Sequence, residues 1–356
     1  MRQQTEKAAS SALNGQQEST GRKMADDERI AVSIGAPPVV EVLLATYNGG
    51  RFLREQIDSI LSQDYKNLRI LARDDGSSDN TTTILNEYER GFPNRFRVIP
   101  TDAPTGSAKN NFLKLMTASS AGYVCFSDQD DVWVSNKISR SMQAMARLEA
   151  HRGAAVPLLV FTDLRVVDDQ LKTLHESFWT QAGIDPSRLR KLATVLVQNP
   201  VTGCTTLINR PLLNLALHMP EEATMHDAWI GLLASACGSF EALRERTVLY
   251  RQHDRNVVGV EARRRSPREL LAVFLSRRPR VLQWKSNERV VEALLRVHGQ
   301  ELSIENRKLL MAYLRCGRHD NRAARLAMMV RYSFFRKGLL RNLITFIDLW
   351  RGKMSC

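Results

Sequence analysis

Three groups of polar and acidic side chains in the first 131 residues have the types that bind a phosphorylated ligand through a metal ion. Each group directly follows a short apolar run. The groups are Thr46-Tyr47-Asn48, Asp74-Asp75-Gly76-Ser77 and Ser127-Asp128-Gln129-Asp130-Asp131. Carboxylates held close together repel one another unless a cation neutralises them. Mg²⁺ or Mn²⁺ binds a few carboxylates together with water and substrate phosphates, so the pattern predicts one of these cations and a phosphorylated ligand.

The spacing within the third group supports this prediction. Asp128 and Asp130 alternate in the sequence, so their side chains point to the same side of an extended segment. A single Asp-rich turn is equally well explained by the preference of aspartate for turns and caps, but three of them are not. The sequence contains neither a dinucleotide-binding glycine motif after the first strand nor a P-loop. Phosphate must therefore be held by the cation and by scattered donors.

Alternating strands and helices would position these groups. Apolar runs predict four buried strands, and amphipathic spacing predicts helices between them. The strands are expected at 39–45, 68–72, 96–99 and 123–127, and one of the helices at 110–119. This alternation is typical of an α/β fold with a doubly wound, mostly parallel sheet, in which ligands bind beyond the carboxyl ends of the strands. The three groups would then meet in one cleft.

The second half of the chain continues this pattern less regularly. Its predicted helices and strands are 135–150, 156–161, 205–208, 211–218, 227–237 and 247–250. From residue 267 onward the pattern is helical and rich in arginine. The predicted organisation is a disordered leader at 1–38, an α/β domain at 39–260 and a basic helical tail at 261–356.

The three groups together resemble the motifs of the family 2 glycosyltransferases, which have the GT-A fold. Three further stretches are similar to the bacterial rhamnosyltransferase-like branch of that family. They are the stretch from Phe126 to Trp133, the run Thr202-Gly203-Cys204-Thr205, and Gln252-His253 with Asn256. The resemblance covers residues 39–258, so it implies that the 39–260 domain is a GT-A catalytic domain.

The resemblance implies a binding site for a nucleotide-diphosphate sugar and its cation. The implied donor-binding residues are Thr46, Tyr47, Asn48, Asp74, Asp75, Lys109, Asn110, Asp128 and Gln129. The carboxylates of Asp74 and Asp75 would contact the base and the ribose. The implied metal ligands are Asp128, Asp130 and His253, although a lone histidine is as often structural.

The resemblance also places the catalytic base at Asp227. Inverting sugar transfer needs a base that takes the proton of the acceptor hydroxyl as its oxygen attacks C1. Many family members carry Glu-Asp at this position, so His226 is a departure from the common pattern. An alternative role for the pair is to cap the helix that follows.

A pocket for the sugar or the acceptor is expected near this base. Its expected residues are Trp133, Thr202, Gly203, Cys204, His226 and Trp229. Aromatic rings often lie beside sugars, but a tryptophan is equally at home in a core. Cys204 has the alternative role of a small buried apolar residue.

The positive charge of the chain is concentrated at one end. The 356 residues include 51 Lys and Arg and 38 Asp and Glu, and residues 261–356 alone hold 22 against 8. Such a block favours a polyanionic partner, either anionic lipid or nucleic acid. No nucleic-acid-binding motif accompanies it, so no nucleic-acid partner is expected. An apolar stripe at 339–350, flanked by arginine and lysine, instead predicts a helix that lies on the anionic inner membrane surface or packs on the protein.

Cysteine usage and the lack of membrane signals bear on location. The five cysteines include no C-x-x-C pair, no apolar run approaches the length of a membrane span, and the first 30 residues hold no apolar stretch as long as that of a secretory signal. The chain is therefore expected to be cytoplasmic, and a tail helix on the membrane would make it peripheral on the inner face of the plasma membrane.

The expected function is inverting, metal-dependent transfer of a sugar in bacterial surface-glycan synthesis. The resemblance favours L-rhamnose from dTDP-L-rhamnose, moved onto a lipid-linked or polysaccharide acceptor of O-antigen, lipopolysaccharide or exopolysaccharide. A galactosyl- or N-acetylhexosaminyl-transferase on the same fold is the alternative. A metal-dependent phosphodiesterase or nucleotidyltransferase would need a second group of carboxylate ligands, which the sequence lacks. A basic nucleic-acid-binding protein is the non-enzymatic alternative.

Overall fold

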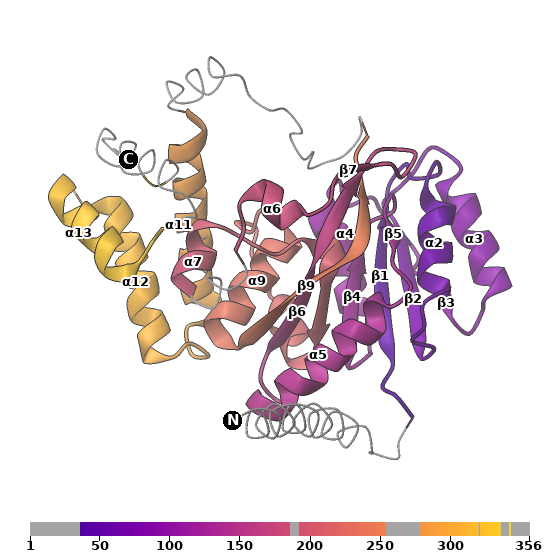
Figure 1. The fold of residues 1–356 in the computed structure, drawn as a ribbon, viewed down its shortest axis with the longest axis horizontal. Coiled ribbons are helices and arrows are strands. Elements are labelled where there is room, and N and C mark those ends of the chain that lie inside the picture. Colours follow the sequence, from indigo (N-terminus) through magenta and orange to yellow (C-terminus); the bar gives the residue numbers. More distant parts are fainter. Residues whose placement is uncertain (1–35, 186–191, 254–277, 320, 336–341, 343–356) are drawn as a thin grey trace, which may run out of the picture. The chain divides into compact units, whose positions relative to one another are not determined.

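The computed structural model describes residues 36–185, 192–253, 278–319, 321–335 and 342 of the chain (Figure 1). The described residues from Val39 onward belong to one compact unit. That unit is built around a single nine-stranded sheet with helices on both faces.

The first half of the sheet is parallel. Its strands, in the spatial order β3-β2-β1-β4, are β3 (Phe96–Val98), β2 (Leu68–Asp74), β1 (Val40–Thr46) and β4 (Tyr123–Ser127). In β1 every residue is buried, because helices cover both faces of this half and leave no face for water. Val40 lies opposite Leu68 on one side and Tyr123 on the other. The four strands predicted from apolar runs are confirmed.

The second half of the sheet is mixed. It contains β5 (Val132–Trp133), β6 (Leu158–Val167), β7 (Thr173–His175), β8 (Thr206–Asn209) and β9 (Ser239–Arg251). β8 runs antiparallel to both β4 and β6, whereas β9 runs parallel to β6. β6 and β9 are longer than predicted because charged residues such as Asp163, Arg165 and Glu245 interrupt their apolar runs.

Helices pack on the two faces according to the alternation of side chains along the strands. Val42 and Leu44 face one apolar cluster, and Leu43 faces the other. The first cluster includes residues of α2 (Leu53–Leu61), α3 (Thr81–Gly91) and α5 (Lys137–Arg152). The second includes residues of α4 (Ala108–Ala118), α8 (Arg210–Ala216) and α9 (His226–Cys237). Alternation of period two therefore decides which helices each strand supports.

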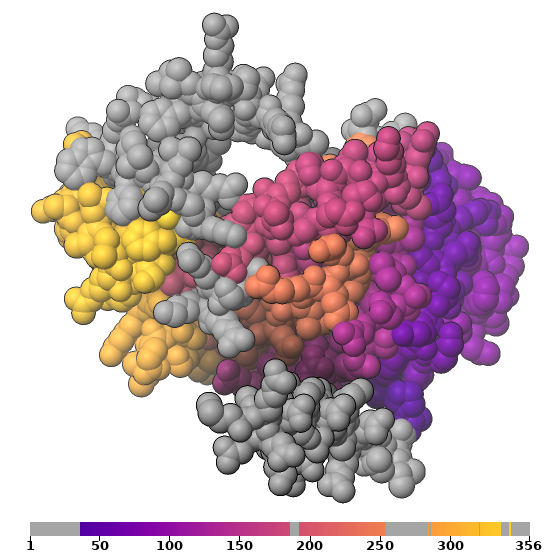
Figure 2. Space-filling view, viewed as in Figure 1, coloured from indigo at the N-terminus to yellow at the C-terminus, as the bar shows by residue number. Residues whose placement is uncertain are grey.

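Three C-terminal helices extend the second cluster. They are α11 (Arg278–His298), α12 (Ile304–Arg318) and α13 (Arg322–Tyr332), and they lie at the end of the unit away from α2 and α3 (Figure 2). Trp284 stacks on Tyr313 with ring centroids 4.4 Å apart. The Asn306 side chain donates a 2.7 Å hydrogen bond to the carbonyl of Ala236, which belongs to α9. The described part of the basic region is therefore helical, as predicted, and packs on the α/β domain.

Several predicted features lie outside the described residues. These are the leader as far as residue 35, Asn256, and the amphipathic stripe at 339–350 apart from Asn342. Among the helices that the structure describes, none is both long enough and apolar enough to span a membrane.

Candidate active site

A cluster of buried carboxylates lies at the end of β4, where the sequence predicts a metal site. The backbone N–H of Arg251 donates a 3.2 Å hydrogen bond to Oδ1 of Asp131, while Oδ2 of Asp131 is buried and makes no hydrogen bond to any described residue. Asp128, Asp131 and the Cys204 thiol each offer one ligand atom, and these atoms lie within 4.8 Å of one another. Potential metal ligands therefore lie close together here, and one oxygen of the cluster, Oδ2 of Asp131, has no hydrogen-bond partner among the described residues.

Asp130 and His253 form a second part of this cluster. Nε2 of His253 lies 2.9 Å from Oδ2 of Asp130, and its ring lies against Phe52 with centroids 5.2 Å apart. Arg251 holds the segment in place, since its Nε donates a 2.8 Å hydrogen bond to the carbonyl of Asp130 and its guanidinium lies over the Phe52 ring. Arg251 is not among the residues predicted from the sequence, where its position two residues before His253 is the available signal.

Crowding and burial disfavour negative charge on these carboxylates. Burial, with the charges of Asp130 and Asp227, raises the pKa of Asp128 to about 7. Burial, with the charges of Asp130 and Asp128, raises the pKa of Asp131 well above its ordinary value. A divalent cation would reverse this, because it stabilises ionised carboxylates in a low-dielectric site. The oxygen donors and the unsatisfied Oδ2 of Asp131 therefore fit Mg²⁺ or Mn²⁺.

Asp128 also lines a cavity of about 870 Å³ that contains the predicted base. Asp227 lies in the first turn of α9, where the N–H of Gly203 donates a 3.0 Å hydrogen bond to Oδ2 and the N–H of Ala228 a 2.6 Å bond to Oδ1. Burial raises the pKa of Asp227 to about 6 despite these two bonds. The N-cap residue of α9 is Met225, so the helix-capping alternative for Asp227 is wrong.

His226 is held as a neutral ring beside the base. Its imidazole lies against both Phe112 and Phe126, with ring centroids 4.0 and 5.0 Å away. Burial lowers the pKa of His226 to about 3, and neither ring nitrogen makes a hydrogen bond to any described residue. At neutral pH the imidazole therefore carries no charge, so it does not place a positive charge beside Asp227.

The other predicted pocket residues divide into two groups. Thr202, Gly203 and Trp229 line the cavity, whereas Cys204 is buried beside the carboxylates. Trp133 is only 3% exposed and does not line the cavity. The Lys137 ammonium lies 4.3 Å from the centre of its ring. Trp133 is therefore a core residue, as the alternative interpretation had it, and the prediction that its ring lies in the sugar pocket is wrong.

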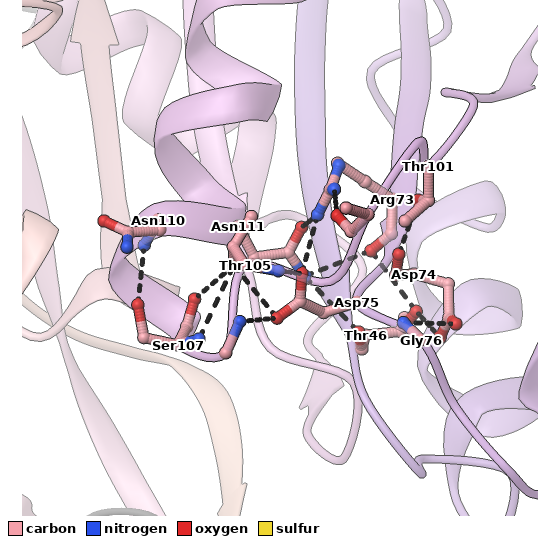
Figure 3. A network of polar contacts seen from close by, with 12 residues as sticks. Thr46, Arg73, Asp74, Asp75, Gly76, Thr101, Thr105, Ser107, Asn110 and Asn111 are labelled. Atoms are coloured by element: carbon pink, nitrogen blue, oxygen red, sulfur yellow. Dashed lines mark hydrogen bonds and ion pairs between the residues drawn. The ribbon is translucent and has the colours of Figure 1, made fainter.

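The second acidic group closes a tight network at the ends of β1 and β2 (Figure 3). Asp74 accepts hydrogen bonds from the Thr46 hydroxyl at 3.0 Å and from the N–H of Ser77 at 2.7 Å. Asp75 accepts from Arg73 at 2.9 Å and from the N–H of Thr105 at 2.7 Å. Burial raises the pKa of Asp75, but the hydrogen bonds from Thr105, Gly106 and Arg73 outweigh it and leave the pKa below its usual value. Asp75 is thus held ionised, and hydrogen bonds fix the orientation of both carboxylates.

The first and third groups are joined directly. The Gln129 side chain accepts from the Tyr47 N–H at 2.7 Å and donates to the Tyr47 carbonyl at 2.9 Å, while the Tyr47 ring is 59% exposed. Asn48 has a left-handed backbone with φ of 49°, and its Oδ1 accepts from the N–H of Ser78 at 2.9 Å. These contacts bring the loops after β1, β2 and β4 together, as the parallel topology predicts.

Lys109 and Asn110 begin α4 but do not point to the same place. The Lys109 ammonium donates 3.0 Å hydrogen bonds to the carbonyls of Glu221 and Ala223, so it holds the loop that leads to Asp227. Asn110 is exposed, and its backbone N–H is accepted by the Ser107 hydroxyl at the helix N-cap.

The chain was compared with known proteins. Residues 41–210 match the family described as Glycosyl transferase family 2. The chain is 29% identical over 234 residues to the dTDP-rhamnosyl transferase RfbG of Shigella flexneri, covering 61% of this chain and 73% of that protein. It is 24% identical over 213 residues to the putative teichuronic acid biosynthesis glycosyltransferase TuaG of Bacillus subtilis, covering 58% and 78%.

Solved structures share the fold at low sequence identity. The structure of S. aureus TarS 1-349 in complex with UDP-GlcNAc has a TM-score of 0.51 at 14% identity, covering 87% of this chain and 81% of that one. The chain therefore carries a family 2 glycosyltransferase domain with the GT-A fold. It is a glycosyltransferase, similar to the rhamnosyltransferase-like branch of the family.

Proposed function

We propose that this glycosyltransferase is an inverting, divalent-cation-dependent enzyme that transfers L-rhamnose from dTDP-L-rhamnose. The observation that carries the proposal is that Asp128 and Asp227 line one cavity. Asp128 belongs to the acidic cluster, and Asp227, in the first turn of α9, is held by two backbone N–H groups. A donor-binding carboxylate and a base on the same cavity are what inverting transfer requires.

Asp227 would act as the base. Its ionised carboxylate takes the proton of the acceptor hydroxyl while the hydroxyl oxygen forms a bond to C1 of the sugar and the bond from C1 to the diphosphate oxygen breaks. The nucleoside diphosphate leaves on the opposite face of the sugar. The hydrogen bond from Gly203 fixes the carboxylate, so little reorganisation is needed when the proton moves. The neutral ring of His226 keeps positive charge away from the base.

The cation would be held by Asp128 and Asp130, with His253 orienting Asp130. When bound, Mg²⁺ or Mn²⁺ neutralises negative charge that develops on the leaving diphosphate. Asp131, buried behind this pair, adds a carboxylate oxygen that no described residue satisfies. The ligand set consists mainly of oxygen atoms, which is the preference of a hard cation.

The nucleotide would lie at the ends of β1 and β2. Asp75, held ionised by Arg73 and Thr105, is the proposed acceptor of a hydrogen bond from the N3–H of a pyrimidine base. Asp74 supports it from within the turn, since its oxygens accept from Thr46 and Ser77. The similarity to a dTDP-rhamnosyl transferase supports a pyrimidine donor with a rhamnosyl group.

The acceptor is proposed to be a lipid-linked or polysaccharide glycan of the bacterial surface, reached from the cytoplasmic side of the membrane. Similarity to proteins named for dTDP-rhamnosyl transfer and teichuronic acid biosynthesis supports this class. The basic C-terminal region supports attraction to an anionic surface. Flotation with anionic liposomes at low salt tests this, with a truncation ending at Phe335 that should float less. Equal flotation of the two proteins would exclude a membrane role for the tail.

Donor identity is tested by incubating the purified chain with dTDP-L-rhamnose, UDP-galactose, UDP-GlcNAc and GDP-mannose, each with Mg²⁺ or Mn²⁺, and measuring release of the nucleoside diphosphate. We expect the fastest release from dTDP-L-rhamnose. Faster release from either UDP-sugar would favour the galactosyl or N-acetylhexosaminyl alternative. Preference for GDP-mannose would contradict the role of Asp75.

A further inference from the structure

The active-site cavity continues well past the carboxylates. Asp128 and Asp227 form its acidic part. Residues of α6 (Phe178–Ala182), α7 (Leu192–Val197), α9 and α11 form much of the remaining wall. The side chains that these helices contribute are mainly apolar and include Phe178, Val195, Leu232, Val290 and Val291. The cavity is therefore amphipathic, with an acidic part and this apolar part.

Helix α11 is built into this wall. The side chain of Asn287 donates a 3.0 Å hydrogen bond to the carbonyl of Leu196, which fixes α11 against α7. Arg296 forms an ion pair with Glu222 in the loop before α9. Val291 is 1% exposed, so the contact surface between α11 and the α/β domain is well packed. The α11 residues Asn287, Val291 and Arg296 lie beyond 41–210, the part of the chain that matches the family.

The apolar part of the cavity is separate from the proposed nucleotide site. In the sheet, β1 and β2 lie on one side of β4, whereas β6 lies on the other side. Thr46, Asp74 and Asp75 do not line the cavity. The cavity is lined by Asp128 and Asp227 but by none of these three residues, so it lies apart from the proposed nucleotide site.

We propose that the apolar part of this cavity binds an apolar aglycone on the acceptor, and that Val290 of α11 is a specificity-determining residue for this aglycone. This inference rests on the proposed function, because it takes Asp227 to mark where the acceptor hydroxyl lies. An acceptor with a sugar next to the carboxylates and a hydrocarbon group against the apolar side chains matches both parts of the cavity. Burial of the hydrocarbon against the valines would contribute affinity in proportion to the apolar area removed from water.

The experiment compares octyl β-D-glucopyranoside, below its micelle concentration, with methyl β-D-glucopyranoside as binding probes, by calorimetry on the full chain with Mg²⁺ and dTDP present. We expect the octyl probe to bind at least about tenfold more tightly, since hydrocarbon groups in apolar pockets give discrimination of this order. The variant Val290→Phe should remove most of this preference by filling the cavity. Val297→Phe adds the same side chain at a position of α11 that is 37% exposed and outside the lining, and it should keep the preference.

The outcomes separate this inference from the proposed function. Equal binding of the two probes by the unmodified chain, or loss of preference in both variants alike, would overturn the aglycone site. Should Val290→Phe unfold, Val290→Gln makes the same wall polar and should also weaken octyl binding. Binding of dTDP should be unchanged in every variant, and weaker dTDP binding in Val290→Phe would assign α11 to the donor instead. Absence of dTDP binding in the unmodified chain would contradict the proposed function, whatever the probes do.

Discussion

The N–H of Gly203 donates a 3.0 Å hydrogen bond to the carboxylate of Asp227, which lies 24 residues further along the chain. The same glycine packs against the neighbouring ring, because a Cβ atom placed on it would lie 2.8 Å from Nε2 of His226. A side chain at this position would have to displace the imidazole, which also packs against Phe112 and Phe126. The run 202–205 and the pair 226–227 thus act as one unit that fixes the base.

Substituting this glycine should therefore impair catalysis. We expect Gly203→Ala to shift His226 and Asp227 and to lower kcat by about 10- to 100-fold, because small displacements of a catalytic group are costly. The rate of nucleoside diphosphate release measures this. Gly122→Ala is the matched control, since a Cβ there meets no atom within 4 Å. A Gly203→Ala enzyme as fast as the Gly122→Ala enzyme would contradict the proposed arrangement.

Asp227 should set the acid limb of the pH profile. Its raised pKa, about 6, means that the carboxylate gains a proton as the pH falls through 6, so the rate should fall below that pH and level off above it. His226, with a pKa of about 3, does not titrate in this range. Asp227→Asn should lower kcat by about 10²- to 10⁴-fold and remove this limb.

Binding of the nucleoside diphosphate is the control for Asp227→Asn. It should be retained, because the residue is proposed to act on the acceptor and not on the donor. Burial disfavours the ionised form of Asp227, so the neutral amide should not lower the melting temperature at pH 8, and any stability advantage should shrink as the pH falls below 6. A variant that lost nucleotide binding together with activity would show that Asp227 is a binding residue.

The metal proposal predicts a large effect at Asp130. Asp130→Asn should lower the rate roughly a thousandfold or more, because a lost metal ligand removes several kcal/mol of transition-state stabilisation. Asp102→Asn, at an exposed loop position, should leave the rate unchanged. Calorimetric titration with Mn²⁺ in the presence of dTDP gives a second measurement, in which only the first variant should bind weakly. Full activity of Asp130→Asn would exclude this ligand.

Lys109 should act on the loop before α9. Since its ammonium is bonded to the carbonyls of Glu221 and Ala223, we expect Lys109→Met to lower kcat several-fold while dTDP affinity stays the same. Lys114→Met, at an exposed position of the same helix, is the control. A marked loss of dTDP affinity in Lys109→Met alone would instead support the donor contact predicted from the sequence.

The parallel half of the fold could be predicted because its strands are buried on both faces. Such strands appear as continuous apolar runs, and β1 and β4 were found in this way. β6 and β9 were predicted too short, since their carboxyl-terminal halves alternate charged and apolar residues. The two-residue strand β5 carries no periodic signal at all.

The candidate site was only partly predictable, for a different physical reason. Carboxylates at strand ends stand out by type and spacing, and Asp128 and Asp227 do lie on one cavity. Arg251 did not stand out, because a buried arginine has no pattern that distinguishes it from a surface one; here it is 1% exposed and organises the acidic loop. Trp133 was misplaced because spacing after an acidic motif does not say which way a ring points. The role of α11 depends on long-range packing that no local pattern encodes.

The most direct test of the central claim is the rate at which the full chain releases dTDP from dTDP-L-rhamnose, measured with Mg²⁺ or Mn²⁺ and again with excess EDTA. The proposed arrangement of Asp128, Asp130 and Asp227 predicts turnover with the cation and essentially none in EDTA. Undiminished turnover in EDTA would contradict the metal site. No turnover of dTDP-L-rhamnose or of any other pyrimidine nucleotide sugar with either cation would contradict the proposed function as a whole.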